Sequence, residues 1–324
     1  MSVIREEQYS GSCFHPSCST EMTERDEMLK KEEEPTPPIL YHYCSLNTLS
    51  KIVGDVGSYG EDVNKDCDRS RMSGSLQMTS FHHLNDPSES LMLKKFCGSH
   101  GNKERYFNGI LNRSKTFVFC MSELEDNLTM WRSYGDDGRG VCIGFNASAL
   151  RSLIGVIYNN IPSDSQRNIS FDLRRVVYAG SKRCLIKKSR VNSIVFDEVS
   201  ENVDPNKLKL KDLLDRAMSC WSVKSRDYEN EKEWRLIASI GDAYFKSGFL
   251  KNGYFLDPLH HLSLRYRFSD HEMSERLFLR LDTGCISKII LGPKCGARQE
   301  ELERYIETHV NSDVEIKSSE KAYA

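Results

Sequence analysis

Short apolar runs separated by turn residues dominate this chain from residue 39 onward. Such runs, bounded by polar, Gly or Pro residues, are typical of β-strands rather than of long helices. They predict strands over residues 39–44, 76–79, 116–121, 141–145, 176–178, 234–239, 277–281 and 286–291.

Helical spacing appears between several of these runs. Ser45 can cap a helix over 46–53 that stops at Gly54, and Asn146 can cap a helix over 147–154. Residues 297–310 also show helical periodicity after a proline. Strands separated by helices predict an α+β fold.

The first 36 residues differ from the rest, because they are polar and charged and show almost no apolar periodicity. We therefore predict a disordered, flexible N-terminal tail over 1–37 and a single α+β domain over 38–318. Two segments rich in small and polar residues, near 54–75 and 191–207, are interpreted as surface insertions.

Composition excludes several classes of protein. Across 324 residues the net charge is −2 and the charged fraction is 28%, which does not indicate general attraction to nucleic acid or to membranes. No run approaches the roughly 18 apolar residues that a membrane span needs, and the N-terminus lacks the pattern of a Sec signal peptide. The 11 cysteines are odd in number and irregularly spaced, which favours reduced thiols in a cytoplasmic protein. No metal is expected, because no close Cys or His pair has a matching second pair.

The stretch "YENEKEWR" at 228–235 carries charged residues at alternate positions. In a strand, Glu231, Glu233 and Arg235 would share one face, while Trp234 and Leu236 would point into a core. Two neighbouring carboxylates would raise the pKa of at least one of them. Taken alone, the octapeptide favours a solvated edge strand in which Arg235 pairs with a glutamate.

Two other blocks contain candidate site residues. In "LYHYCS" at 40–45, alternation places His42 on one face and the flanking tyrosines on the other. In "FCMSELEDNLTMWRSYGDDGRGVCIGF" at 119–145, Trp131 is expected in the core, and Arg139 lies between two glycines where it could approach an anion.

These blocks, together with "LNDPSES", "EKEWRLI" and "ISKIILGP", occur in an order that resembles the bacterial family called domain of unknown function 2971. The resemblance covers roughly residues 39 to 310. Their order also resembles ADP-ribosyltransferases, which have a His or Arg on the first strand and a Glu-x-Glu on a late strand.

The second resemblance implies a split β-sheet core with flanking helices and a cleft that binds NAD as substrate. By this resemblance Glu233 is the catalytic carboxylate, Glu231 orients the acceptor and His42 positions NAD. It also implies a set of further NAD-binding residues, which are Tyr43, Ser45, Trp131, Tyr134 and Arg139, with Trp131 or Tyr134 stacking on nicotinamide. In that family a serine or threonine closely follows the His or Arg of the first strand, whereas Cys44 and Ser45 follow His42 here. For the serine-rich middle strand, the candidates are Thr79 with Ser80, or Ser122.

Three functions remain open from the sequence. The leading one is a mono-ADP-ribosyltransferase that modifies a macromolecular acceptor, for which we expect a protein rather than a nucleic acid. It would act as a toxin or effector in the cytoplasm or after translocation into a recipient cell. The second is a ligand-binding or regulatory module in which the Glu/Arg pattern is structural. The third is a metal-dependent hydrolase or nuclease, for which the candidate residues are His82, His83, Asp86 and Glu89.

Overall fold

A computed structural model describes residues 36–54, 72–83, 114–161, 166, 169–179, 221–241, 262–268, 273–282, 284–310 and 313–322. Residues Pro37–Ala324 form one compact unit, to which all the elements below belong. Residues 1–35 of the predicted tail and the predicted insertion at 191–207 lie outside the described residues.

The strands of the main sheet are β1 (Ile39–Cys44), β2 (Met72–Ser80), β3 (Ser114–Ser122), β4 (Val141–Asn146), β5 (Ile169–Arg175), β8 (Glu233–Gly241), β9 (Leu262–Phe268), β10 (Met273–Asp282), β11 (Ile286–Leu291) and β12 (Glu315–Ser318). A separate parallel pair consists of β6 (Val177–Ala179) and β7 (Val223–Ser225). The α-helices are α2 (Leu46–Gly54), α5 (Leu128–Tyr134), α6 (Ala147–Asn160) and α11 (Gln299–His309), and the short 3-10 helices are η3 (Phe81–His83) and η5 (Arg226–Glu231). The predicted α+β class is confirmed.

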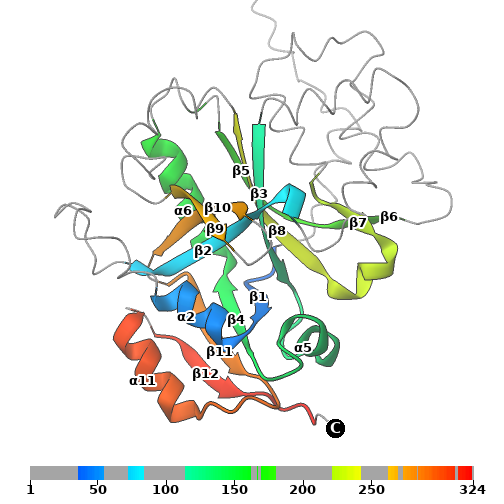
Figure 1. Ribbon diagram of the computed structural model, residues 1–324, viewed down its shortest axis with the longest axis vertical. Helices are drawn as coiled ribbons and strands as arrows, with labels where there is room; N and C mark the ends of the chain where they lie inside the picture. Colours follow the sequence, from blue (N-terminus) through cyan, green and yellow to red (C-terminus); the bar gives the residue numbers. More distant parts are fainter. Residues whose placement is uncertain are drawn as a thin grey trace, which may run out of the picture. The chain divides into compact units, whose positions relative to one another are not determined.

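The main sheet has ten strands, and eight of them follow the order β12-β11-β4-β1-β3-β2-β10-β9. Strand β8 pairs with β3 outside this order, and β5 pairs with β8. All pairs in the sheet are antiparallel except β11 with β12. Figure 1 shows the strands crossing the centre of the unit, with α2 and α11 beside β11 and β12 at one end.

The sheet forks at β3. One edge of β3 pairs with β8 along its whole length, from Ser114 to Ser122. The other edge pairs with β1 only at Ser122 and with β2 only at Phe117 and Val118. Within the described residues, no strand pairs with residues 119–121 along this second edge, and β1 and β2 diverge there.

The predicted helix caps are present. The backbone N–H of Thr48 donates to the Ser45 hydroxyl at 3.2 Å, which satisfies a free donor in the first turn of α2. The side chain of Asn146 accepts from the backbone N–H of Ala149 at 3.0 Å at the start of α6. Both helices therefore begin where the sequence predicts.

Strand β2 passes close to α2 because Gly74 has no side chain. Its φ of +135° is rarely adopted by other residues, and an added Cβ would lie 2.2 Å from the carbonyl oxygen of Ile52. The predicted insertion over 54–75 therefore ends earlier than expected, since β2 already begins at Met72. Residues 55–71 lie outside the described part of the chain.

The alternation predicted for β1 is confirmed. Leu40 and Cys44 are buried in the main hydrophobic core, whereas Tyr41 and Tyr43 are buried in a second cluster with Trp131. In β8, Trp234 and Leu236 belong to the main core, as the pattern predicts. None of the described helices is long and apolar enough to cross a membrane.

Two expectations for "YENEKEWR" are wrong. Strand β8 is not a solvated edge, because it lies between β3 and β5 and all its residues are buried. The strand begins at Glu233, so Glu231 is the last residue of η5 and not part of an alternating strand. Lys232, between them, has φ 44°, and this left-handed conformation turns the chain from η5 into β8.

Strands β5, β7, β9 and β12 were not predicted. Each mixes charged or hydroxyl residues with only a few apolar ones, as in "ISFDLRR" and "LSLRYRF". Such segments become strands because a neighbouring strand supplies hydrogen bonds along a whole edge, which local sequence does not reveal.

Candidate functional site

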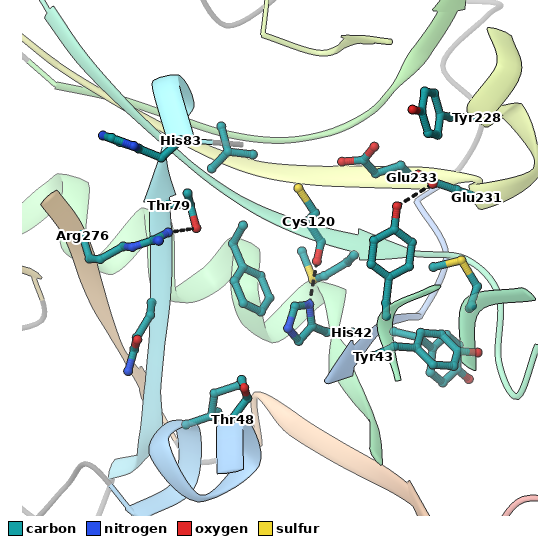
Figure 2. A pocket seen from close by; sticks show the side chains of 18 of the residues that line it. His42, Tyr43, Thr48, Thr79, His83, Cys120, Tyr228, Glu231, Glu233 and Arg276 are labelled. Atoms are coloured by element: carbon teal, nitrogen blue, oxygen red, sulfur yellow. Dashed lines mark hydrogen bonds between the residues drawn. The ribbon is translucent and has the colours of Figure 1, made fainter. Parts of the chain in front are cut away.

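A pocket of about 480 Å³ opens at the fork of the sheet. Its wall is formed by β1, β2, β3 and β10, by α2 and α5, and by residues of the 224–233 segment. Figure 2 shows His42 and Cys120 in the middle of this wall, with Glu231 and Glu233 on one side and Arg276, Thr79 and His83 on the other. The pocket has the size of a typical small-molecule site.

His42 projects from β1 toward the partly unpaired edge of β3. Its Nδ1 lies 2.8 Å from the carbonyl oxygen of Cys120 and must donate, because a carbonyl only accepts. The ring also packs on Phe119 with 4.4 Å between centroids. This side chain thus supplies a hydrogen bond that a neighbouring strand supplies elsewhere in the sheet.

Burial lowers the pKa of His42, although the Cys120 carbonyl partly opposes this shift. The imidazole is therefore neutral near neutral pH. Since Nδ1 carries the proton, Nε2 is an acceptor. A neutral acceptor at this position can fix a ligand hydroxyl group.

Glu233 starts β8 at the opposite side of the pocket and is only 4% exposed. Arg235, two residues along the same face, is 1% exposed and donates from Nε to the Glu233 carboxylate at 2.7 Å and from Nη2 at 3.2 Å. The guanidinium also donates to the carbonyl of Trp221 at 2.8 Å. The predicted pairing of Arg235 with a glutamate is present, but it is a buried pair.

The pKa of Glu233 is lowered, contrary to the rise expected for neighbouring carboxylates. Burial raises it, but the positive charges of Arg235 and Lys224 and their hydrogen bonds outweigh burial. The carboxylate is consequently ionised at neutral pH. A buried carboxyl group that stays ionised at the wall of a pocket can stabilise developing positive charge.

Glu231 lies beside Glu233 through its position at the end of η5. Its carboxylate accepts from the Tyr134 hydroxyl at 2.6 Å and from Lys224 Nζ at 2.7 Å. The turn that carries it is attached to the end of β3, because the Ser122 hydroxyl donates to the Glu231 carbonyl at 2.6 Å. The predicted juxtaposition of Glu231 and Glu233 is therefore achieved by a turn.

Lys224 of β7 joins the two carboxylates. Its Nζ lies 3.0 Å from Glu233 Oε2 in addition to its contact with Glu231, and it lies over the Tyr228 ring at 4.6 Å. Burial lowers the pKa of Lys224, but the negative charges of the two glutamates raise it by more than burial lowers it. The ammonium group therefore stays charged. Lys224 is a site residue that the sequence did not predict.

The other side of the pocket carries cationic and hydroxyl groups. Arg276 of β10 donates from Nη1 to the hydroxyl of Thr79, with which it pairs in register across β2. Lys51 of α2 and His83 of η3 also line this part of the pocket. The sequence did not identify Arg276 as a site residue. Its strand was predicted to begin at residue 277, so Arg276 was assigned to no strand.

The predicted NAD-binding residues are only partly brought together. Tyr43 and Tyr134 line the pocket with His42, whereas Ser45, Trp131 and Arg139 do not. The side chain of Trp131 is fully buried and its indole N–H donates to Asp126 at 2.8 Å, which matches its expected place in the core rather than a stacking role.

Ser45 caps α2, as described above. Arg139 is exposed and forms an ion pair with Asp136 at 3.3 Å outside the pocket. Because neither residue reaches the pocket, a ligand held there would not contact them. Thr48, one turn after the cap, lines the pocket in place of Ser45.

The residues proposed for a metal-dependent reaction are only partly visible. His83 lines the pocket, but Asp86 and Glu89 lie outside the described residues. In the part of the chain that the structure describes, no group of three or more His, Cys, Asp or Glu side chains could hold a metal ion. The metal-dependent alternative stays a prediction.

Residues 130–236 match the model of a family described as "Protein of unknown function (DUF2971)". The match covers 107 of the 324 residues. The matched segment runs from α5 into β8 and includes Tyr134, Lys224, Glu231 and Glu233, which line the pocket. The predicted DUF2971 resemblance is confirmed over residues 130–236 and stays a prediction for the rest of 39–310. The looser resemblance to ADP-ribosyltransferases also stays a prediction. No curated protein and no solved structure matches the chain.

Proposed function

We propose that this protein is a mono-ADP-ribosyltransferase that cleaves NAD and transfers ADP-ribose to a macromolecular acceptor. One observation carries the proposal: His42 from β1 and the Glu231/Glu233 pair beside β8 line the same pocket, at the fork of the sheet. These residues are distant in sequence. The resemblance in motif order predicted that they would belong to one site.

The reaction breaks the bond between the ribose C1′ and the nicotinamide nitrogen, and the electron pair leaves with neutral nicotinamide. Positive charge then develops on the ribose, as in glycoside cleavage. The ionised carboxylate of Glu233 is the group proposed to stabilise that charge. The ion pair with Arg235 holds the carboxylate in one orientation, which limits reorganisation during the reaction.

Glu231 is proposed to act on the acceptor. A nucleophilic atom of the acceptor forms the new bond to C1′ and loses a proton, which a carboxylate beside Glu233 can accept. Glu231 is bound by the Tyr134 hydroxyl, whose side chain is 37% exposed, so this carboxylate lies near the solvent side of the pocket. An acceptor approaching from solvent would meet it first. A protein acceptor in the cytoplasm of a target cell is the partner that this proposal implies.

His42 is proposed to position NAD through its neutral Nε2, which can accept a hydrogen bond from a ribose hydroxyl. Tyr134 supplies an aromatic ring at the mouth of the pocket for the nicotinamide. No residue of this proposal requires a metal ion.

Nicotinamide release from NAD by the purified chain tests the proposal. We expect release by the parent protein, and a loss of at least about 100-fold in the Glu233→Gln variant, since a side chain that stabilises transition-state charge contributes on that order. Glu275→Gln is the control, because it removes a carboxylate from an ion pair with Lys115 outside the pocket.

Absence of release by a folded parent protein, with a candidate acceptor lysate present, would contradict the transferase. Thermal melts of all three proteins are needed, because Glu233 also belongs to a buried ion network.

That network favours the second candidate function, a ligand-binding module in which Glu233 is structural. The observation behind it is the burial of Arg235 and Lys224 around one carboxylate. This function predicts that Glu233→Gln lowers the melting temperature while NAD neither reacts nor shifts the melt of the parent.

A further inference from the structure

The ammonium group of Lys224 lies between the two carboxylates on one side of the pocket. Lys224 Nζ donates to Glu231 Oε2 at 2.7 Å and to Glu233 Oε2 at 3.0 Å, and the lysine is buried. Figure 2 shows Glu231 and Glu233 next to each other on this side of the pocket. Two carboxylates that share one site repel each other, and without a cation one of them turns away or binds a proton.

Arg235 and Tyr134 each orient one of the carboxylates. Arg235 donates to Glu233 from Nε at 2.7 Å and from Nη2 at 3.2 Å, and the Tyr134 hydroxyl donates to Glu231 Oε1 at 2.6 Å. These bonds do not set the spacing between the two carboxylates. The double contact of Lys224 does, because one nitrogen atom binds an oxygen of each.

The short β6–β7 pair fixes Lys224 relative to Glu233. Tyr178 of β6 lies opposite Lys224 in register, and its hydroxyl accepts from the backbone N–H of Glu233 at 2.7 Å. The backbone N–H of Val176 donates to the Glu233 carbonyl at 2.8 Å. The ammonium group also lies 4.6 Å from the centroid of the Tyr228 ring, which is a cation–π contact. The flexible lysine side chain is thus held at one place beside the start of β8.

We propose that Lys224 is a positioning residue, which holds the carboxylates of Glu231 and Glu233 side by side at the wall of the pocket. Both carboxylates then face one bound molecule at the same time, at neighbouring atoms. The use of this pair in NAD cleavage rests on the proposed function, whereas the positioning does not.

The charge of Lys224 gives this role a pH dependence that can be measured. Burial raises the pKa of Glu233, and the positive charges of Arg235 and Lys224 lower it by more. An opposite charge nearby lowers the pKa of a carboxyl group by roughly 1 to 3. Loss of the Lys224 charge should therefore raise the pKa of Glu233.

Other titratable groups surround this carboxylate or line the same pocket. Burial raises the pKa of the Tyr134 and Tyr178 hydroxyls, so both stay neutral in the pH range of the test. The remaining groups are Cys120 of β3, His42 of β1, and Tyr228 and Glu231 of η5. These groups are present in every Lys224 variant, so a difference between Lys224 variants reports on Lys224.

The pH profile of nicotinamide release tests the role of Lys224 in the reaction. In Lys224→Met, the acid limb of the profile should move to higher pH by about 1 to 3 pH units relative to the parent. Release should therefore fall at about pH 6 and recover toward about pH 8. Lys224→Arg keeps the positive charge and should keep the acid limb of the parent. A lysine with a purely structural role would lower release equally at every pH.

Lys288→Met is the matched control. Lys288 is also a poorly exposed lysine between two carboxylates, 3.1 Å from both Glu125 and Glu315, and it lies outside the pocket. Its substitution should leave the pH profile of release as in the parent. If Lys224→Met does not fold, Lys224→Gln takes its place in every measurement, because an amide donates hydrogen bonds without a charge.

Double-mutant cycles of the free energy of unfolding test the positioning without any reaction. Lys224→Met is combined with Glu231→Gln and, separately, with Glu233→Gln. In both cycles the loss in the double variant should be smaller than the sum of the two single losses, because one lysine interacts with both carboxylates. Additive losses with either glutamate would overturn the positioning.

The two measurements separate this proposal from the proposed function. Release by the parent with an unchanged acid limb in Lys224→Met would overturn the role of Lys224 and leave the transferase. No release by the parent, with coupling in both cycles, would remove the transferase and keep the positioning.

Discussion

The two edges of β3 have different partners, and this difference explains where the pocket lies. Along one edge, β8 pairs with every residue of β3 from Ser114 to Ser122. Along the other, β1 and β2 each pair only briefly and then diverge. The continuous edge supports a strand buried on both faces, whereas the divided edge leaves space that side chains and a ligand can occupy.

Polar groups are satisfied differently at the two edges. Beside the continuous edge, charged groups neutralise one another, as in the Glu233 and Arg235 pair. At the divided edge, a side chain replaces a strand, since His42 donates to the carbonyl of Cys120. Buried polar groups need partners in both cases, and Glu233 and His42 line the same pocket from its two sides.

The strongest test of the continuous edge is Arg235→Met. This change removes one partner of a carboxylate that is almost completely buried, and we expect a loss of about 3 to 5 kcal/mol in the free energy of unfolding. Urea denaturation measures it. Arg226→Met is the control, because its ion pair with Glu229 is exposed, with side chains 71% and 57% accessible, and should contribute less than about 1 kcal/mol. Equal losses in both variants would contradict the buried-network interpretation.

The divided edge is tested by the pH dependence of stability. The folded-state pKa of His42 lies below its ordinary value, so between that value and about 6.5 the unfolded chain binds a proton that the folded chain does not. The free energy of unfolding should therefore fall as pH drops below about 6.5, by up to about 1.4 kcal/mol per pH unit from this group.

His42→Asn removes the titrating group and keeps a donor near the position of Nδ1. Melts of the parent and this variant between about pH 7 and pH 5 isolate the contribution of His42 as a difference. Parallel pH profiles would show that His42 titrates normally and is not held neutral at the fork.

The smallest effect on stability is expected for Tyr134→Phe. This change tests whether the hydrogen bond from Tyr134 to Glu231 contributes to holding α5 against the segment before β8. Tyr134 on α5 donates to Glu231 beside β8, and its partial exposure limits the loss in stability to about 1 kcal/mol. Tyr266→Phe is the control, since its exposed hydroxyl donates to Glu275 outside the pocket at 2.8 Å. A loss of unfolding free energy well above that of the Tyr266→Phe control would show that the Tyr134 hydrogen bond is needed for stability.

Local sequence predicted the elements with strong apolar patterns. Strand β1 and strand β11 were predicted with their observed bounds, and the caps Ser45 and Asn146 were identified from residue type and position. These features depend on neighbours a few residues apart, so the sequence contains the required information. The neighbouring glutamates at 231 and 233 were also visible, although the turn at Lys232 was not.

The opposite side of the pocket could not be predicted in this way. Arg276 and Lys51 are separated by hundreds of residues, and each alone is an ordinary charged residue in an amphipathic element. Lys224 lies in a strand of three residues that exists because β6 supplies its hydrogen bonds.

The sequence by itself therefore determined the α+β class, the main strands, the helix caps and the DUF2971 resemblance. Periodicity and capping are local properties, and motif order is visible along the chain without knowledge of which segments meet. Only the tertiary structure decided that β8 is buried, that β3 divides the sheet, and that His42, Glu233 and Arg276 line one pocket. Strand order and register depend on hydrogen bonds between segments far apart in the chain, and no local pattern specifies which edges meet.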